Sequence, residues 1–172
     1  IEEAGLEGLV AEGIAERHVW PLGEGAPGTE VPREPDEVAF IQFSSGSTRA
    51  PKGVIIRQGQ ALADLRSIGE GIGLGASART FSWMPLSHDM GLVGFHLAPL
   101  RWGADQALMP TSAFARTPLV WLQDAAALGS TILSSPNFGY RHALKSIDRK
   151  GIPDGVDLSG VRLIMNGAEP IS

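Results

Sequence analysis

Cysteine is absent from the 172 residues of the sequence, which excludes disulfide bonds and thiolate metal sites. The 14 lysine and arginine residues are scattered singly among 19 acidic ones, and the net charge is −5. Nucleic-acid-binding domains typically carry a basic patch or stripe, so we expect no nucleic-acid partner. No apolar run approaches the roughly 20 residues of a membrane-spanning helix, and the first residues lack the basic start of a secretory signal. We therefore expect a cytoplasmic protein without a transmembrane segment.

The composition that remains is that of an ordinary globular protein. Apolar residues make up 43% of the chain and charged residues 19%, and the length corresponds to about one domain. Residues 1–37 are predicted to form a helix (1–16) followed by an exposed connector rich in proline, glycine and charge (21–37). Residues 38–172 form a second unit with a different pattern.

Short apolar runs alternate with longer helical patterns in residues 38–172, which is typical of parallel βαβ units. Strands are predicted at 38–43, 53–57, 79–85, 105–110, 131–135 and 161–167. Helices are predicted at 60–73, 91–103, 118–129 and 137–150. The first strand, VAFIQF, is predicted to be buried on both faces. The predicted fold class is α/β, with a mostly parallel sheet flanked by helices.

Ligands of parallel sheets bind at the carboxyl ends of the strands. Four loops of unusual composition follow predicted strands: SSGSTRAPKG (44–53), LSHDMG (86–91), SPNF (135–138) and GAEP (167–170). We expect these loops to form one site along one edge of the sheet.

The first of these loops has the composition of an anion-binding segment. A glycine-serine turn presents backbone N–H groups to an anion, the Ser45, Ser47 and Thr48 hydroxyls add donors, and Lys52 adds a point charge. The Walker A pattern does not match, because Pro51 precedes the lysine and a strand-like run follows it. From the residues alone, a solvated serine-rich hairpin is an equal alternative.

The whole stretch FSSGSTRAPKGV resembles the phosphate-binding loop of the adenylate-forming (AMP-binding) superfamily, which includes acyl-CoA synthetases, peptide-synthetase adenylation domains and fatty acyl-AMP ligases. The segments WMPLSHDMG, SSPNFGY and NGAEP follow it in the order of that superfamily. His88 followed by Asp-Met-Gly, the PNFGY stretch and the NGAEP loop resemble fatty acyl-AMP ligases most. The resemblance implies that residues 38–172 are part of the large N-terminal domain of such an enzyme.

By the same resemblance, the parent protein is expected to activate a fatty acid with ATP and Mg²⁺, release pyrophosphate, and pass the acyl group to an acyl carrier protein for polyketide, nonribosomal peptide or lipid biosynthesis. An acyl-CoA synthetase and a non-catalytic nucleotide- or acyl-binding module are the alternatives. The family's magnesium-binding glutamate, ribose-binding aspartate and lysine-bearing C-terminal domain do not occur before Ser172. We therefore assign no metal ligand and expect the chain alone to be inactive.

The resemblance also implies roles for individual residues. The ATP phosphates are assigned to Ser44, Ser45, Gly46, Ser47, Thr48 and Lys52. The adenine is assigned to a platform of Asn166, Gly167, Ala168 and Glu169. The acyl chain and adenosine are assigned to Asn137, Phe138 and Tyr140, and the reacting carboxylate and α-phosphate to His88, which together with Lys52 is the predicted catalytic pair.

Structural roles compete with several of these assignments. Phe138 and Tyr140 are equally well explained as core residues, and the helix at 91–103 either lines an acyl tunnel or packs in the core. Asp89 is predicted to cap the helix that begins at Met90. His96 is predicted to be a hydrogen-bonded packing residue.

Overall fold

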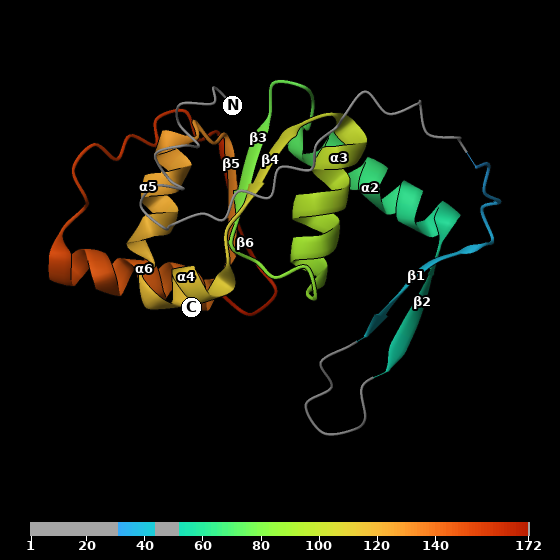
Figure 1. Cartoon of the computed structure of the whole chain (residues 1–172), viewed down its shortest axis with the longest axis horizontal. Helices are drawn as coiled ribbons and strands as arrows, with labels where there is room; N and C mark the ends of the chain where they lie inside the picture. The colour runs from blue at the N-terminus through green and yellow to red at the C-terminus, as the bar shows by residue number, and fades with distance from the viewer. Residues whose placement is uncertain (1–30, 44–51, 172) are drawn as a thin grey trace.

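The structure is a computed structural model that describes residues 31–43 and 52–171. In this part of the chain a parallel sheet lies between two groups of helices, and a two-stranded antiparallel ribbon extends away from them (Figure 1). The strands are β1 (Val38–Phe43), β2 (Gly53–Arg57), β3 (Arg79–Ser82), β4 (Asp105–Leu108), β5 (Ile132–Pro136) and β6 (Leu163–Gly167). The helices are α2 (Gln58–Ile72), η1 (Met90–Leu97), α3 (Ala98–Trp102), α4 (Thr111–Arg116), α5 (Leu119–Ala127) and α6 (Asn137–Lys150).

The parallel sheet has the strand order β4-β3-β5-β6. Thr80 of β3 pairs with Ile132 of β5, and Pro136 at the end of β5 pairs with Gly167 at the end of β6. All four strands run in the same direction, so their carboxyl ends meet at one edge. The predicted α/β class, with a mostly parallel sheet flanked by helices, is confirmed.

Alternate residues of β5 enter two separate apolar cores, as the two-residue period of a strand requires. Leu133 belongs to the core that also buries Phe114 and Trp121, on the side of α4, α5 and α6. Ile132 belongs to the core that also buries Phe95, on the side of α2, η1 and α3. Because both faces of the sheet are covered, its edge is where a ligand can reach the ends of the strands.

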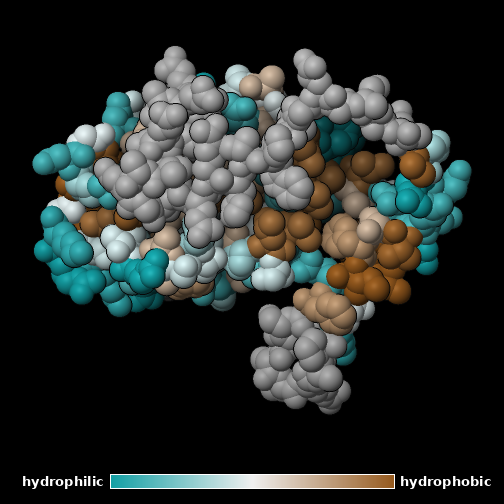
Figure 2. Space-filling model, viewed as in Figure 1, coloured by the Kyte–Doolittle hydropathy of each residue, from teal (hydrophilic) through white to brown (hydrophobic). Residues whose placement is uncertain are grey.

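The ribbon formed by β1 and β2 is the main departure from the predicted fold. β1 pairs with β2 in antiparallel fashion, and neither strand belongs to the parallel sheet. Val38, Ile41 and Phe43 are 51%, 52% and 64% exposed, so the prediction that this strand is buried on both faces is wrong. The apolar run does not lie between helical layers, and Figure 2 shows apolar surface where the ribbon meets the body.

The helices follow the predicted pattern with two exceptions. α6 has the predicted bounds, and α2 begins two residues before the predicted start. The predicted helix at 91–103 is instead a π-helix, η1, followed by α3, because the Ala98 N–H donates to the Val93 carbonyl five residues earlier. The sequence pattern does not predict α4, since its six residues are too few to show a period. The helix predicted at 1–16 lies outside the described residues.

None of the helices described by the structure has the length and apolar character needed to cross a bilayer.

Candidate functional site

Three of the four predicted loops meet at the carboxyl edge of the parallel sheet. The Ser134 hydroxyl of β5 lies 3.5 Å from the Met90 sulfur, at the start of η1. A Cβ placed on Gly167 of β6 would lie 3.5 Å from the Met90 methyl group. The Asn166 amide donates to the Asn137 amide oxygen at 3.4 Å. These contacts bring three segments together around the Met90 side chain: the loop after β3, the start of α6 and the end of β6.

The loop after β3 places the His88 ring beside the Asp89 carboxylate. The His88 N–H donates to the Pro85 carbonyl at 3.0 Å, which closes a turn. Asp89 caps η1 as predicted, because its Oδ1 accepts from the Met90 N–H at 2.7 Å. The same Oδ1 lies 2.7 Å from His88 Nδ1. The Met90 N–H also points at His88 Nδ1, at 3.2 Å. With Nδ1 in contact with both groups, and no contact to Nε2 within the described ranges, Nε2 is the ring atom free to meet a ligand.

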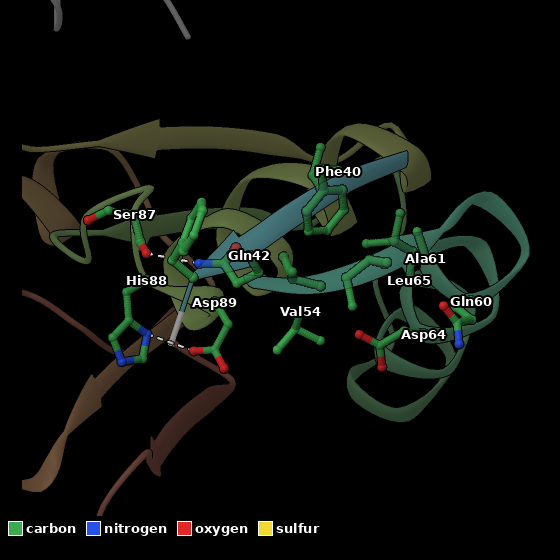
Figure 3. Close-up of a pocket in the computed structure, with 14 residues that line it drawn as sticks. Phe40, Gln42, Val54, Gln60, Ala61, Asp64, Leu65, Ser87, His88 and Asp89 are labelled. Carbon is green, nitrogen blue, oxygen red and sulfur yellow. Dashed lines mark hydrogen bonds and ion pairs between the residues drawn. The ribbon is translucent and has the colours of Figure 1, made fainter. Parts of the chain in front are cut away.

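A pocket of about 630 Å³ opens between the ribbon, α2 and this loop (Figure 3). Its apolar wall includes Phe40, Val54, Leu65, Val93 and Leu97. Its polar residues include Gln42, Asp64, His88 and Asp89. In Figure 3, His88 and Asp64 lie at opposite ends, with Val54 between them. The pocket therefore combines an apolar wall with an oriented imidazole at one end, as an acyl chain ending in a carboxylate would require.

A second cleft, of about 450 Å³, lies at the N-terminus of α6. Its lining includes Asn137, Phe138 and Glu169, together with Arg141 and Lys145. Glu169 Oε1 accepts from the Phe138 N–H at 2.5 Å. A carboxylate in this position compensates the first turn of the helix, where backbone donors are otherwise unpaired. The Glu169 side chain therefore fixes the loop after β6 to α6, while Phe138 is 56% exposed.

The loop after β6 has an unusual backbone conformation and an unpaired side-chain atom. Ala168 has a φ of 69°, in the left-handed region that non-glycine residues seldom adopt. The Asn166 Oδ1 is buried and has no hydrogen-bond partner among the residues that the structure describes. A buried acceptor without a partner costs about 1–3 kcal/mol, so this atom lowers the stability of the loop after β6 in the arrangement that the structure describes.

Tyr140 lies beneath the site rather than in either cavity. Its hydroxyl donates to the Met165 carbonyl at 2.6 Å, and its ring lies 5.7 Å from that of Trp121. Burial raises the pKa of Tyr140 to about 12. The contacts show a residue that ties α6 to β6.

Titration of Tyr140 should report this environment directly, because the chain contains one tyrosine. The raised pKa means that the folded state holds the phenolic proton more tightly than the unfolded state, whose pKa is about 10. The associated stability is complete below pH 10 and is lost as the pH rises from about 10 to about 12. Tyrosinate absorbance should therefore have its midpoint near 12 in the folded chain. Between about pH 10 and about pH 12 the melting temperature of Tyr140→Phe should fall less than that of the wild type. A tyrosinate midpoint near pH 10 in the folded chain would contradict the burial of Tyr140.

Comparison with known proteins identifies the chain. The AMP-binding enzyme family matches residues 4–172. The chain belongs to this family. The resemblance carried by the four motifs is thereby confirmed.

Relatives of this AMP-binding chain include enzymes with different acyl acceptors. A Caulobacter vibrioides protein assigned to the acyl-CoA synthetases is 41% identical over 119 residues, covering 69% of this chain and 21% of the relative. The medium-chain-fatty-acid–[acyl-carrier-protein] ligase TtuA of Teredinibacter turnerae is 36% identical over 138 residues, covering 80% and 21%. A crystal structure of a fatty acyl-adenylate ligase from L. pneumophila, in complex with acyl adenylate and pyrophosphate, has a TM-score of 0.78 at 36% identity, covering 83% and 25%. The chain thus spans about a fifth of the length of these curated relatives.

The AMP-binding chain brings only some of its predicted site residues together. His88 lines the larger pocket, whereas Asn137, Phe138 and Glu169 line the cleft at α6. Lys52 is exposed directly before β2. The predicted phosphate-binding residues 44–48 lie outside the described part of the chain, so their assignment stays a prediction.

Two pocket residues of this AMP-binding chain escape prediction from sequence. Gln42 is the single polar residue in the run VAFIQF, and its amide donates to the Ser87 carbonyl at 2.9 Å (Figure 3). Asp64 lies on the pocket side of α2. The isolated glutamine in an apolar strand is a signal that could have been noticed, whereas Asp64 belongs to an ordinary polar helix face.

Proposed function

We propose that the protein carrying this chain activates a fatty acid with ATP, forming an acyl adenylate and pyrophosphate. The observation that carries the proposal is the larger pocket, in which an apolar wall ends at the oriented imidazole of His88. The family and the likeness to a ligase crystallised with acyl adenylate and pyrophosphate support it.

In the proposed reaction a carboxylate oxygen of the fatty acid attacks the α-phosphorus of ATP. The new P–O bond forms as the bond to the bridging oxygen breaks, and pyrophosphate leaves with its electron pair. Such a reaction needs alignment of the reactants and donors aimed at the developing charge. We assign His88 Nε2 to the carboxylate and the α-phosphate, and Lys52 with residues 44–48 to the β- and γ-phosphates.

The loop after β6 is the proposed adenine site, and no magnesium ligand is assigned. A Cβ added at Gly167 would meet no atom closer than 3.5 Å, so a flat ring can approach the backbone of this residue. Within residues 31–43 and 52–171, no group of three or more His, Asp or Glu residues could hold a metal ion. We therefore assign the adenine to residues 166–169 and derive no step through Mg²⁺.

For the second step we propose transfer of the acyl group to the thiol of an acyl carrier protein that feeds polyketide, nonribosomal peptide or lipid assembly. The similarity to TtuA, a ligase with this type of acceptor, supports the assignment. Coenzyme A is the second candidate acceptor, and the similarity to the Caulobacter vibrioides protein supports it.

Product analysis of the protein expressed from its full reading frame tests both steps. It would be incubated with ATP, magnesium and mixed fatty acids, with coenzyme A, with a carrier protein, or with neither, and the products identified by mass spectrometry. We expect acyl adenylate in every case and an acyl thioester with the carrier only. Acyl-CoA would assign the protein to the synthetases. Nucleotide binding without any acyl product would favour a binding module.

A further inference from the structure

The Gln42 side chain, near the end of β1, joins the ribbon to the loop that carries His88. The Gln42 Nε2 on β1 donates to the Ser87 carbonyl at 2.9 Å, across 45 positions of sequence (Figure 3). Gln42 is half-buried in the wall of the larger pocket. The bond gives the one amide of this otherwise apolar strand a partner on the loop that precedes η1.

The ribbon is anchored to the body at its other end by backbone hydrogen bonds. The Gln58 N–H donates to the Glu37 carbonyl and the Gly59 N–H to the Pro35 carbonyl, both at 2.9 Å. These bonds lie where β1 begins and β2 ends. Gln42 lies near the opposite end of β1. The ribbon is therefore held at its base by main-chain contacts and near its tip by this side chain.

Backbone hydrogen bonds within the His88 loop and the start of η1 also hold the loop, independently of its contact with the ribbon. The His88 N–H bonds to the Pro85 carbonyl, and the Leu92 N–H bonds to the His88 carbonyl at 2.8 Å. Loss of the Gln42 contact would thus leave the loop folded. What would change is the separation between the ribbon tip and the imidazole.

We infer that Gln42 is a positioning residue that holds the ribbon in register with His88. This inference rests on the proposed function, because the ribbon leads at Ser44 into the predicted phosphate-binding segment and His88 follows Ser87 directly. The phosphate donors and the imidazole must act on the same nucleotide at once. A misplacement of about 1 Å between reacting groups can cost about a hundredfold in rate.

Gln42→Met tests the inference, because methionine has nearly the shape of glutamine but cannot donate to the Ser87 carbonyl. In the full-length protein we expect the rate constant for acyl-adenylate formation to fall about ten- to a hundredfold. The KM for the fatty acid should change by less than about threefold, because the apolar wall of the pocket is kept. Gln123→Met, on the exposed outer side of α5, is the matched control and should keep the wild-type rate.

A second measurement tests whether Gln42 influences the His88 ring, and it does not depend on enzymatic activity. With ¹³C-labelled histidine, the His88 ring resonance, identified by its loss in His88→Gln, should shift in Gln42→Met and stay unchanged in Gln123→Met. A wild-type rate together with an unmoved resonance in Gln42→Met would overturn the inference. If the wild-type protein forms no adenylate, the proposed function fails, while the resonance still decides whether Gln42 positions His88.

Discussion

Gly91→Ala is expected to lower the free energy of unfolding by about 3 kcal/mol or more. A Cβ at this position would lie 2.3 Å from the Pro85 carbonyl oxygen and 2.9 Å from that of Met84. Both atoms belong to the backbone, so no side chain can rotate away and the loop or η1 must move. Overpacking typically costs about 1–3 kcal/mol and more where the backbone has to shift. Urea denaturation of the variant beside the wild type measures the effect.

Gly94→Ala is the matched control, because it lies in the same π-helix and a Cβ there would meet nothing within 4 Å. Alanine favours a helix over glycine by up to about 1 kcal/mol, so this variant should be as stable as the wild type or slightly more so. Equal losses in both variants would show that η1 itself, rather than the close approach of Gly91 to the Pro85 carbonyl, rejects a side chain.

Elements whose limits are encoded locally could be predicted from the sequence. α6 has the predicted bounds because Pro136 precedes it, Gly151 follows it and its apolar residues repeat with the helical period. β5 and β6 were identifiable as short apolar runs between such helices. Their order in the sheet, β4-β3-β5-β6, required the structure, because no local pattern states which strands are neighbours.

The ribbon and η1 could not be predicted for a different reason. The run VAFIQF has the composition of a buried parallel strand, yet β1 pairs only with β2 among the described strands and exposes Ile41 and Phe43. The apolar composition of a strand indicates that its side chains can be buried, but it does not indicate which other element packs against them. Likewise, the pattern of residues 91–103 indicates a helix, but the π-type hydrogen bond from Ala98 to Val93 is not visible in it.

The candidate site was predictable as a set of motifs and not as a set of contacts. The order of the motifs led to His88, and the Asp89 cap followed from its place before a helix. The bond from Glu169 to the Phe138 N–H spans 31 positions and that from Gln42 to Ser87 spans 45. Such contacts arise from the arrangement of the strands, so they became visible only in three dimensions.

His88→Gln is expected to lower acyl-adenylate formation by the full-length protein about a hundredfold. Asp89 Oδ1, 2.7 Å from Nδ1, fixes the ring and leaves Nε2 for the carboxylate and α-phosphate. The glutamine side chain lacks the second nitrogen through which Asp89 orients the ring, so its amide is not held in place. With Nδ1 paired to Asp89, Nε2 is a donor in the protonated form of the ring, and removing one oriented donor of this kind typically costs about 10²–10³-fold in rate. Fatty-acid-dependent exchange of labelled pyrophosphate into ATP measures the step.

Two further variants separate this role from a loss of structure. Asp89→Asn keeps a good helix cap, since asparagine and aspartate cap equally well, but it weakens the contact to Nδ1; we expect a smaller loss, of about tenfold. His96→Gln should keep the wild-type rate, because its imidazole bonds the Gln106 side chain and the residue lines neither of the two cavities. An unchanged rate in His88→Gln would remove the imidazole from the reaction. A hundredfold loss in Asp89→Asn as well, with the melting temperature unchanged, would show that the carboxylate matters as much as the ring it orients.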